Sequence, residues 1–138
     1  MAYLFPSDDW LQALKDKLNN DPNYARIARK WEGELLFEIE ADGPLEETSY
    51  FYLDLWHGTC RDAFMVEKGN LDDLEAAYVL TAPYSQITRL LKGELDPMQA
   101  MITRKLKVKG SMAYMMRNVP VVLDFVRCAQ EIEAEILE

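Results

Sequence analysis

The chain contains little cysteine and almost no histidine, the side chains that build most structural metal sites. Its cysteines are Cys60 and Cys128, and His57 is its single histidine. Two cysteines cannot form a disulfide framework or a four-thiolate metal site, and one histidine cannot form a histidine pair. We therefore expect neither a disulfide framework nor a metal site built from four thiolates or a histidine pair.

The sequence also lacks a long apolar run. No stretch approaches the roughly 18–20 apolar residues that cross a bilayer. Residues 1–10 do not show the basic and then apolar pattern of a signal peptide. The formal net charge is −9, which disfavours contact with the phosphates of nucleic acids. We expect a soluble cytoplasmic protein that does not bind nucleic acid.

The residues that are present suffice for one folded domain. The chain has 138 residues, of which 49% are hydrophobic, and a chain of this length buries roughly 65–70% of its unfolded surface. No internal repeat or low-complexity linker divides it. We expect residues 1–138 to form a single domain.

Helix-start signals lie near both ends of the chain. Ser7 precedes two acidic residues, as a typical helix N-cap does. Asp21–Pro22 and Asp96–Pro97 each combine a capping side chain with proline at the first helical position. Pro83 opens another helical pattern, and a last helix is predicted from Val119 to the end of the chain.

The middle of the chain alternates apolar and polar residues, which is typical of strands with one solvated face. We expect strands at residues 35–39, 48–56, 61–66, 76–81 and 105–109. The short connections favour an antiparallel meander. Strands grouped between helical ends predict an α+β fold, with helices over one face of a mostly antiparallel sheet.

A tight turn is predicted at Gly58–Thr59, which would place His57 opposite Cys60 across a hairpin. A thiol beside an imidazole, with Asp54 or Asp62 to orient it, is the starting point of nucleophilic catalysis. However, a single local cluster supplies no site for an oxyanion. We interpret the pair as part of a solvent-exposed turn and expect no catalytic residue.

A basic stripe follows the predicted helix that starts at Pro97. It consists of Arg104, Lys105, Lys107 and Lys109. Lysines on an edge strand protect it from pairing with other chains, and this is the interpretation we favour. The alternative is a transient contact with anionic lipid head groups at a membrane surface.

Methionine is concentrated in one part of the chain, with five of the seven residues between positions 98 and 116. Two groups each share one helical face: Met98, Met101 and Ile102, and then Met112, Met115 and Met116. Methionine is unbranched and flexible, so it suits either a core or an apolar surface that accepts ligands of varied shape. Spacing alone favours ordinary core packing.

The segment from Thr81 to Arg117 resembles a known family. Residues 90–100 read Leu-Leu-Lys-Gly-Glu-Leu-Asp-Pro-Met-Gln-Ala, and residues 105–110 read Lys-Leu-Lys-Val-Lys-Gly. This is similar to the C-terminal signature of the sterol carrier protein-2 family. There, a helix that ends in glycine leads through Asp-Pro to a short helix, a lysine-rich strand and another helix. Arg104 departs from the family, which commonly has glycine there, and Ser111 replaces a common aspartate.

The resemblance implies a five-stranded, mostly antiparallel sheet whose covering helices enclose an apolar tunnel. Members of the family bind fatty acids, acyl-CoA, sterols or isoprenoid lipids, and they mostly catalyse nothing by themselves. The resemblance implies no metal and no other cofactor. The implied lining consists of Leu90, Leu91, Met98, Met101, Ile102, Met112, Met115, Met116 and Phe125. The function expected is binding and transfer of a lipid or another hydrophobic small molecule.

Two other readings remain open at this stage. The fold could serve as a protein-interaction or homodimerisation module, or as an accessory factor in isoprenoid-quinone lipid metabolism that transfers no free lipid. The chain could also be a small lipid-modifying enzyme that uses Cys60 and His57. The first reading predicts a small pocket, and the second requires both side chains to converge beside a cavity.

Overall fold

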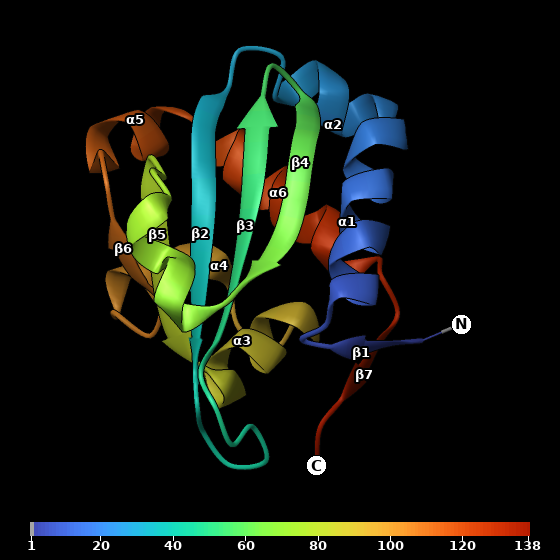
Figure 1. Cartoon of the computed structure of the whole chain (residues 1–138). Coiled ribbons are helices and arrows are strands. Elements are labelled where there is room, and N and C mark those ends of the chain that lie inside the picture. Colours follow the sequence, from blue (N-terminus) through green and yellow to red (C-terminus); the bar gives the residue numbers. More distant parts are fainter. Residues whose placement is uncertain (1) are drawn as a thin grey trace.

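A computed structural model describes residues 2–138 of the chain. Helices and a five-stranded sheet form an α+β fold, as predicted (Figure 1). The elements are β1 (Tyr3–Phe5), α1 (Asp8–Asn20), α2 (Pro22–Ile27), β2 (Glu32–Glu40), β3 (Ser49–Trp56), β4 (Thr59–Val66), the 3-10 helix η1 (Lys68–Asp73), β5 (Tyr78–Pro83), α3 (Tyr84–Leu91), α4 (Pro97–Ile102), β6 (Lys107–Lys109), α5 (Met112–Arg117), α6 (Val119–Gln130) and β7 (Ala134–Ile136).

Local capping signals set the starts of four helices. The side chains of Ser7, Asp21, Asp96 and Ser111 accept hydrogen bonds from backbone N–H groups in the first turns of α1, α2, α4 and α5. Each cap satisfies donors that a helix N-terminus leaves unpaired. The first three of these helix starts were predicted from the sequence and are confirmed.

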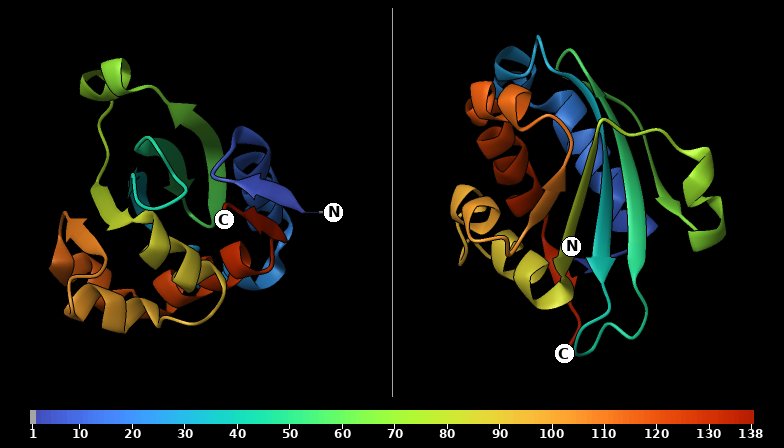
Figure 2. Two further views of the ribbon diagram at one scale, coloured as in Figure 1. Left: turned by 90° about the horizontal axis from the view of Figure 1, so that it is seen from below. Right: turned by 90° about the vertical axis from the view of Figure 1, so that its left-hand side faces the viewer.

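The large sheet has the strand order β4-β3-β2-β5-β6. Three of its strand pairs are antiparallel, but β5 runs parallel to β2, with Phe37 opposite Leu80. The predicted meander is therefore wrong at this step. The connection from β2 to β5 contains β3, β4 and η1, so it easily exceeds the dozen or so residues that a parallel pair requires. Figure 2 shows η1 projecting on the side of the sheet opposite the helices.

The hairpin between β3 and β4 turns one residue earlier than predicted. Trp56 pairs with Thr59, and the turn residues His57 and Gly58 have φ values of 50° and 80°. Such a turn needs positive φ at both central positions, which β-branched Thr59 disfavours. A Cβ on Gly58 would also lie 2.6 Å from the Ala25 carbonyl oxygen. His57 and Cys60 are consequently not a cross-strand pair.

The two ends of the described chain meet in a small second sheet that the sequence did not predict. β1 and β7 pair in parallel, with Tyr3 opposite Ala134 and Phe5 opposite Ile136 (Figure 1). The predicted final helix therefore stops at Gln130. Helices α3 to α6 cover the rear face of the large sheet in Figure 1, and α1 flanks its β4 edge. The core lies between these layers.

Candidate functional cavity

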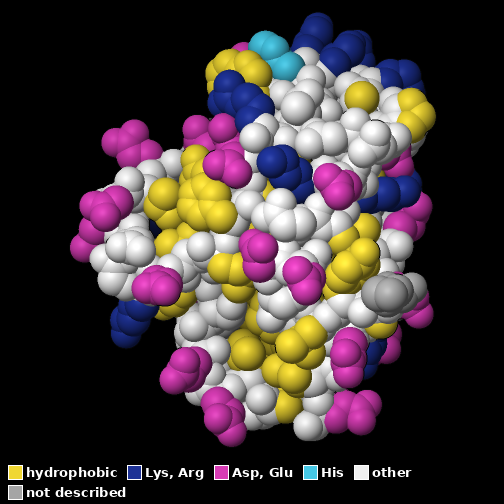
Figure 3. Space-filling view, turned by 45° about the vertical axis from the view of Figure 1, so that its right-hand side comes forward, with side chains coloured by type: hydrophobic (Ala, Val, Ile, Leu, Met, Phe, Trp, Pro, Cys, Tyr) yellow, Lys and Arg dark blue, Asp and Glu magenta, His cyan; other side chains and the backbone are white. Residues whose placement is uncertain are grey.

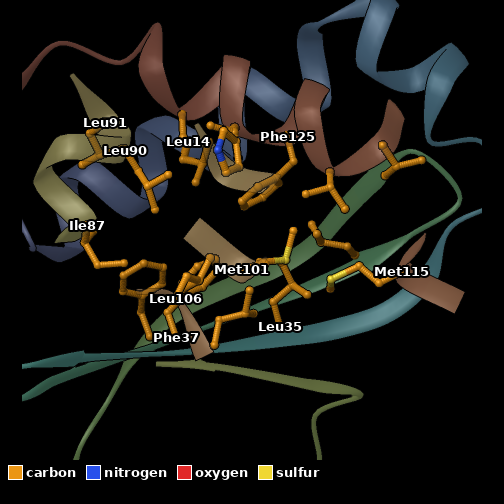
Figure 4. Close-up of a pocket in the computed structure, with 18 of the residues that line it drawn as sticks. Leu14, Leu35, Phe37, Ile87, Leu90, Leu91, Met101, Leu106, Met115 and Phe125 are labelled. Atoms are coloured by element: carbon orange, nitrogen blue, oxygen red, sulfur yellow. The ribbon is translucent and has the colours of Figure 1, made fainter. Parts of the chain in front are cut away.

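An apolar cavity of about 100 Å³ lies between the sheet and the helices. β2 contributes Leu35 and Phe37 to its floor, and the helices approach from the other side (Figure 4). Alternation along β2 and β3 points every second side chain toward the helices. The remaining lining residues are Phe5, Trp10, Leu14, Tyr24, Trp31, Phe51, Leu55, Leu80, Ile87, Leu90, Leu91, Pro97, Met101, Leu106, Met115, Val121, Val122, Phe125, Val126 and Ala129.

As far as the structure describes it, over residues 2–138, the cavity wall carries no ionised side chain and few polar atoms. The Trp31 indole N–H donates to the Gly33 carbonyl at 3.0 Å. Burial raises the pKa of the Tyr24 hydroxyl, which is therefore neutral at physiological pH. Among the described residues, the buried Nε1 of Trp10 finds no acceptor. The wall suits hydrocarbon, and one hydrogen-bond donor in it lacks a partner.

Aromatic contacts join the sheet to the helix layer. The Phe37 ring stacks on Phe51, with centroids 4.9 Å apart, and on Phe125 of α6 at 6.2 Å. Phe5 lies edge-on to Trp10 at 4.7 Å. These offset and edge contacts are favourable geometries for aromatic pairs, so they fix α6 over β2.

Five of the nine residues in the predicted lining lie on the cavity: Leu90, Leu91, Met101, Met115 and Phe125. The other four, Met98, Ile102, Met112 and Met116, are not part of its wall. Ile102, Met112 and Met116 are 69%, 41% and 51% exposed. Adjacent residues on a helix point about 100° apart, so Met101 faces inward and Ile102 faces solvent. The same rotation separates Met115 from Met116.

The sequence-based lining omitted the sheet and α1. Leu35, Phe37, Phe51 and Leu55 belong to strands whose apolar alternation is visible in the sequence. That pattern predicts burial, but it does not distinguish a filled core from a cavity wall. Trp10 was likewise recognised only as part of an apolar helix face.

Cys60 and His57 do not form a catalytic pair. The Cys60 thiol donates to the Asp62 carbonyl at 3.3 Å, and burial raises its pKa to about 12. His57 instead contacts Glu32, with 2.6 Å between Nε2 and Oε2, on an exposed part of the surface. Neither residue belongs to the cavity wall. A protonated, buried thiol without a neighbouring base is a poor nucleophile.

In the described part of the chain, one largely buried cluster has atoms spaced for a metal ion, namely Asp21, Asp124 and Cys128, within 4.8 Å of one another. Arg127 already donates to both carboxylates, at 3.0 Å and 2.8 Å. Burial raises the pKa of the Cys128 thiol to about 11, so it is protonated at neutral pH. The cluster is therefore an ion-pair network that joins α2 to α6.

Among the described residues, no helix is long and apolar enough to cross a membrane. Comparison with protein families matches residues 11–122 to the SCP-2 sterol transfer family. Comparison with curated protein sequences finds no match.

Solved structures with the same fold include a crystal structure of sterol carrier protein 2. It is 31% identical, with a TM-score of 0.82, and the match covers 91% of this chain and 97% of that protein. A conserved hypothetical protein from Thermus thermophilus is 30% identical, with a TM-score of 0.83 and coverage of 98% and 93%. A sterol carrier protein-2 from Aedes aegypti, solved in complex with palmitate, is 18% identical, with a TM-score of 0.54 and coverage of 87% and 93%.

Proposed function

The chain belongs to the SCP-2 sterol transfer family, and on that premise we propose that it binds the apolar part of a lipid in its cavity and transfers it without catalysing a reaction. The candidate cargo is a fatty acid, an acyl-CoA, a sterol or an isoprenoid lipid. The observation that carries the proposal is the cavity wall, which is built from apolar and aromatic side chains on both layers of the fold.

Hydrocarbon burial alone supplies enough free energy for such binding. Each buried methylene contributes about 0.8 kcal/mol, so a sixteen-carbon tail gains roughly 13 kcal/mol before costs. Ordering the tail and losing its overall freedom costs several kcal/mol or more. Micromolar to nanomolar affinity is consistent with that balance, and no ion pair in the cavity is needed.

The cavity must widen before it accepts a whole lipid. Its volume of about 100 Å³ is well below the roughly 300–1,000 Å³ of typical ligand pockets. Met101 and Met115 stand on two six-residue helices, α4 and α5, and methionine changes rotamer readily. We propose that outward movement of these helices makes the additional room.

The first experiment identifies any lipid that is bound to the purified protein. The purified protein is extracted with organic solvent, and the extract is analysed by mass spectrometry beside that of an unrelated acidic protein. A lipid present at about one molecule per protein would support a carrier and name its class. A blank extract, together with failure to bind fluorescent fatty acids and sterols, would contradict the proposal.

The lining is tested by paired substitutions on the same helices. Met101→Glu and Met115→Glu place a charge in the cavity wall, and we expect each to abolish uptake of a fluorescent fatty acid. Ile102→Glu and Met116→Glu are the matched controls, because these neighbours are exposed, and they should bind normally. Circular dichroism verifies folding. Normal binding by folded Met101→Glu and Met115→Glu would show that the lining is assigned wrongly.

A second candidate is an interaction module, which the small cavity volume favours. In that case the protein's own methionines fill the pocket, and the chain acts as a homodimer or beside a partner enzyme. Light scattering coupled to size exclusion measures the mass of the assembly. A dimer that carries no lipid would favour this candidate over the carrier.

A further inference from the structure

Three helices over the cavity carry apolar side chains on their outer faces as well as their inner ones. In α5, Met115 lines the cavity while Met112 and Met116 are exposed. Ile102 at the end of α4 and Leu123 of α6 are exposed in the same way. Among the described residues, these four and Leu4 of β1 are the exposed large hydrophobic side chains. The exposed large hydrophobic side chains are therefore concentrated on α4, α5 and α6.

The same segment differs in charge from the rest of the protein. From Pro97 to Leu123 the chain has no aspartate or glutamate, whereas its overall formal charge is −9. It has five basic residues, all of them exposed: Arg104, Lys105, Lys107, Lys109 and Arg117. In the described part of the chain none of the five forms an ion pair, although Lys17, Arg61 and Arg127 do. Their charges are therefore available to an anionic partner.

These side chains belong to neighbouring elements. α4, β6 and α5 occupy one side of the molecule in Figures 1 and 2, and α5 packs on α6. Figure 3 looks from another direction, toward the β4 and α1 side, and shows many acidic side chains spread over that surface. Acidic side chains are thus frequent outside residues 97–123, which contain none.

Protection of an edge strand explains only part of this surface. β6 is an edge strand, and Lys107 and Lys109 discourage its pairing with another chain. Arg117 lies on a helix, and Arg104 lies in a loop with φ of 62°. This left-handed conformation is strained for arginine and easy for glycine. A strained residue whose side chain has no ion pair is a reason to look for a binding role.

We infer that this surface docks on anionic phospholipid membranes. We call it the docking face and define it by Ile102, Met112, Met116 and Leu123 together with the five basic residues. The cations meet the lipid phosphates, and the four apolar side chains enter the headgroup–acyl boundary. A nucleic acid would satisfy only the cations. Because α4, α5 and α6 also line the cavity, docking brings the cavity wall next to the bilayer, although membrane binding itself does not depend on the proposed cargo.

The docking face is tested by co-sedimentation with vesicles of phosphatidylcholine alone and of equal amounts of phosphatidylcholine and phosphatidylserine. Each basic residue near an anionic surface contributes about a fivefold factor in affinity. We therefore expect wild-type protein to bind the anionic vesicles preferentially. Reversing two charges with Lys105→Glu and Arg117→Glu should reduce that binding by about thirtyfold or more. The control is the double variant Lys15→Glu with Lys68→Glu, whose net charge equals that of the Lys105/Arg117 variant. Because its changes lie outside the docking face, it should bind like the wild type.

Apolar substitutions separate membrane insertion from simple charge attraction. Met116→Ser with Ile102→Ser should weaken binding to anionic vesicles several-fold, whereas Leu4→Ser, outside the docking face, should not. Equal binding to both kinds of vesicle, no binding, or an equal loss in the Lys15/Lys68 control would overturn the inference. So would tighter binding to single-stranded RNA that the apolar variants leave unchanged. Uptake of a fluorescent fatty acid, measured without vesicles, tests the carrier function separately.

Discussion

Arg104 stands one residue beyond the C-cap of α4 in the left-handed backbone conformation. In the family that the segment Thr81–Arg117 resembles, glycine is common at this position, and the φ of 62° gives that preference a physical cause. Helices often end with a left-handed residue, which glycine adopts without the clash of a Cβ atom. Arginine at this position adds a positive charge that glycine lacks, at the cost of a strained backbone conformation.

The substitution Arg104→Gly should therefore stabilise the fold and weaken membrane binding. Relief of the strained conformation, less the greater chain entropy of unfolded glycine, predicts a net gain of roughly 0.5–1 kcal/mol in the free energy of unfolding. Urea denaturation measures the gain, and co-sedimentation with anionic vesicles measures the loss. A variant that is less stable than the wild type would show that Arg104 makes a stabilising contact.

Trp10 supplies a second prediction at the scale of one residue. Its buried indole N–H has no acceptor among the described residues and belongs to the cavity wall. A lipid that places a carbonyl or hydroxyl oxygen beside it would remove the cost of an unpaired donor. In ¹⁵N-labelled protein, a bound fatty acid should shift the Trp10 indole resonance downfield, and Trp10→Phe assigns the signal. A shift of the Trp31 resonance alone would contradict the idea, because Trp31 already donates to Gly33.

The ion-pair network between helices ties α1 and α2 to α6. Asp21 caps α2, and its carboxylate also receives hydrogen bonds or ion pairs from Arg127 and Lys17. The Tyr24 backbone N–H, followed by the Arg127 and Lys17 side chains, lowers the pKa of Asp21 from its usual 3.8 to about 2. A carboxylate whose pKa is depressed in the folded state stabilises the protein above its unfolded pKa.

That contribution should disappear in acid. Above about pH 4, Asp21→Asn should unfold at lower urea concentration than the wild type. The difference should shrink as pH falls from about 4 toward 2, because the wild-type carboxylate then becomes protonated. A series of urea titrations across this range measures it. A difference that stays constant with pH would mean that the charge of Asp21 plays no part.

Elements whose signals are local could be predicted from the sequence, and those that depend on distant pairing could not. Ser7, Asp21 and Asp96 each cap the residues that directly follow them, so their helices were found. The β1–β7 pair joins positions about 130 residues apart, and no periodicity reports such a contact. The hairpin turn was misplaced by one residue for two reasons. β-branched Thr59 disfavours the positive φ of a central turn position, and the backbone of α2, distant in sequence, packs against Gly58.

The cavity wall, like the fold, could be predicted only in part from the sequence. Clustering of methionine pointed to α4 and α5, and the structure places Met101 and Met115 of these helices in the cavity wall. It did not identify which face of each helix points inward, because α4 and α5 are apolar on both faces. That ambiguity arises from the exposed apolar residues that we assign to the docking face. The strands opposite were missed because core and cavity wall have the same alternation.

At the scale of the whole molecule, one hydroxyl group holds together segments from both ends of the chain. Tyr84 Oη donates to the Phe5 carbonyl at 3.0 Å and accepts from the Leu137 N–H at 2.9 Å. It thereby joins β1, α3 and the residues after β7. The Tyr84 side chain and its bond to Phe5 are buried, so water cannot replace that bond.

Removal of the Tyr84 hydroxyl should destabilise β1 and β7 more than the rest of the protein. Tyr84→Phe should lower the free energy of unfolding by about 2 kcal/mol, because the buried Phe5 carbonyl and the half-buried Leu137 N–H lose their partner. Hydrogen exchange should accelerate most in β1 and β7, and lipid binding should change little. Unchanged exchange in these strands would indicate that Phe5 and Leu137 find other partners.

The parallel pairing of β1 with β7 also has a mechanical consequence. Tension applied through the flanking residues pulls Tyr3 and Ile136 toward opposite ends of the strand pair. The load then acts along the strands, so the hydrogen bonds between them must be sheared together instead of unzipped one at a time. An unfolding enzyme that pulls on either end of the chain would meet its first resistance at this strand pair, whose Phe5 also lines the cavity.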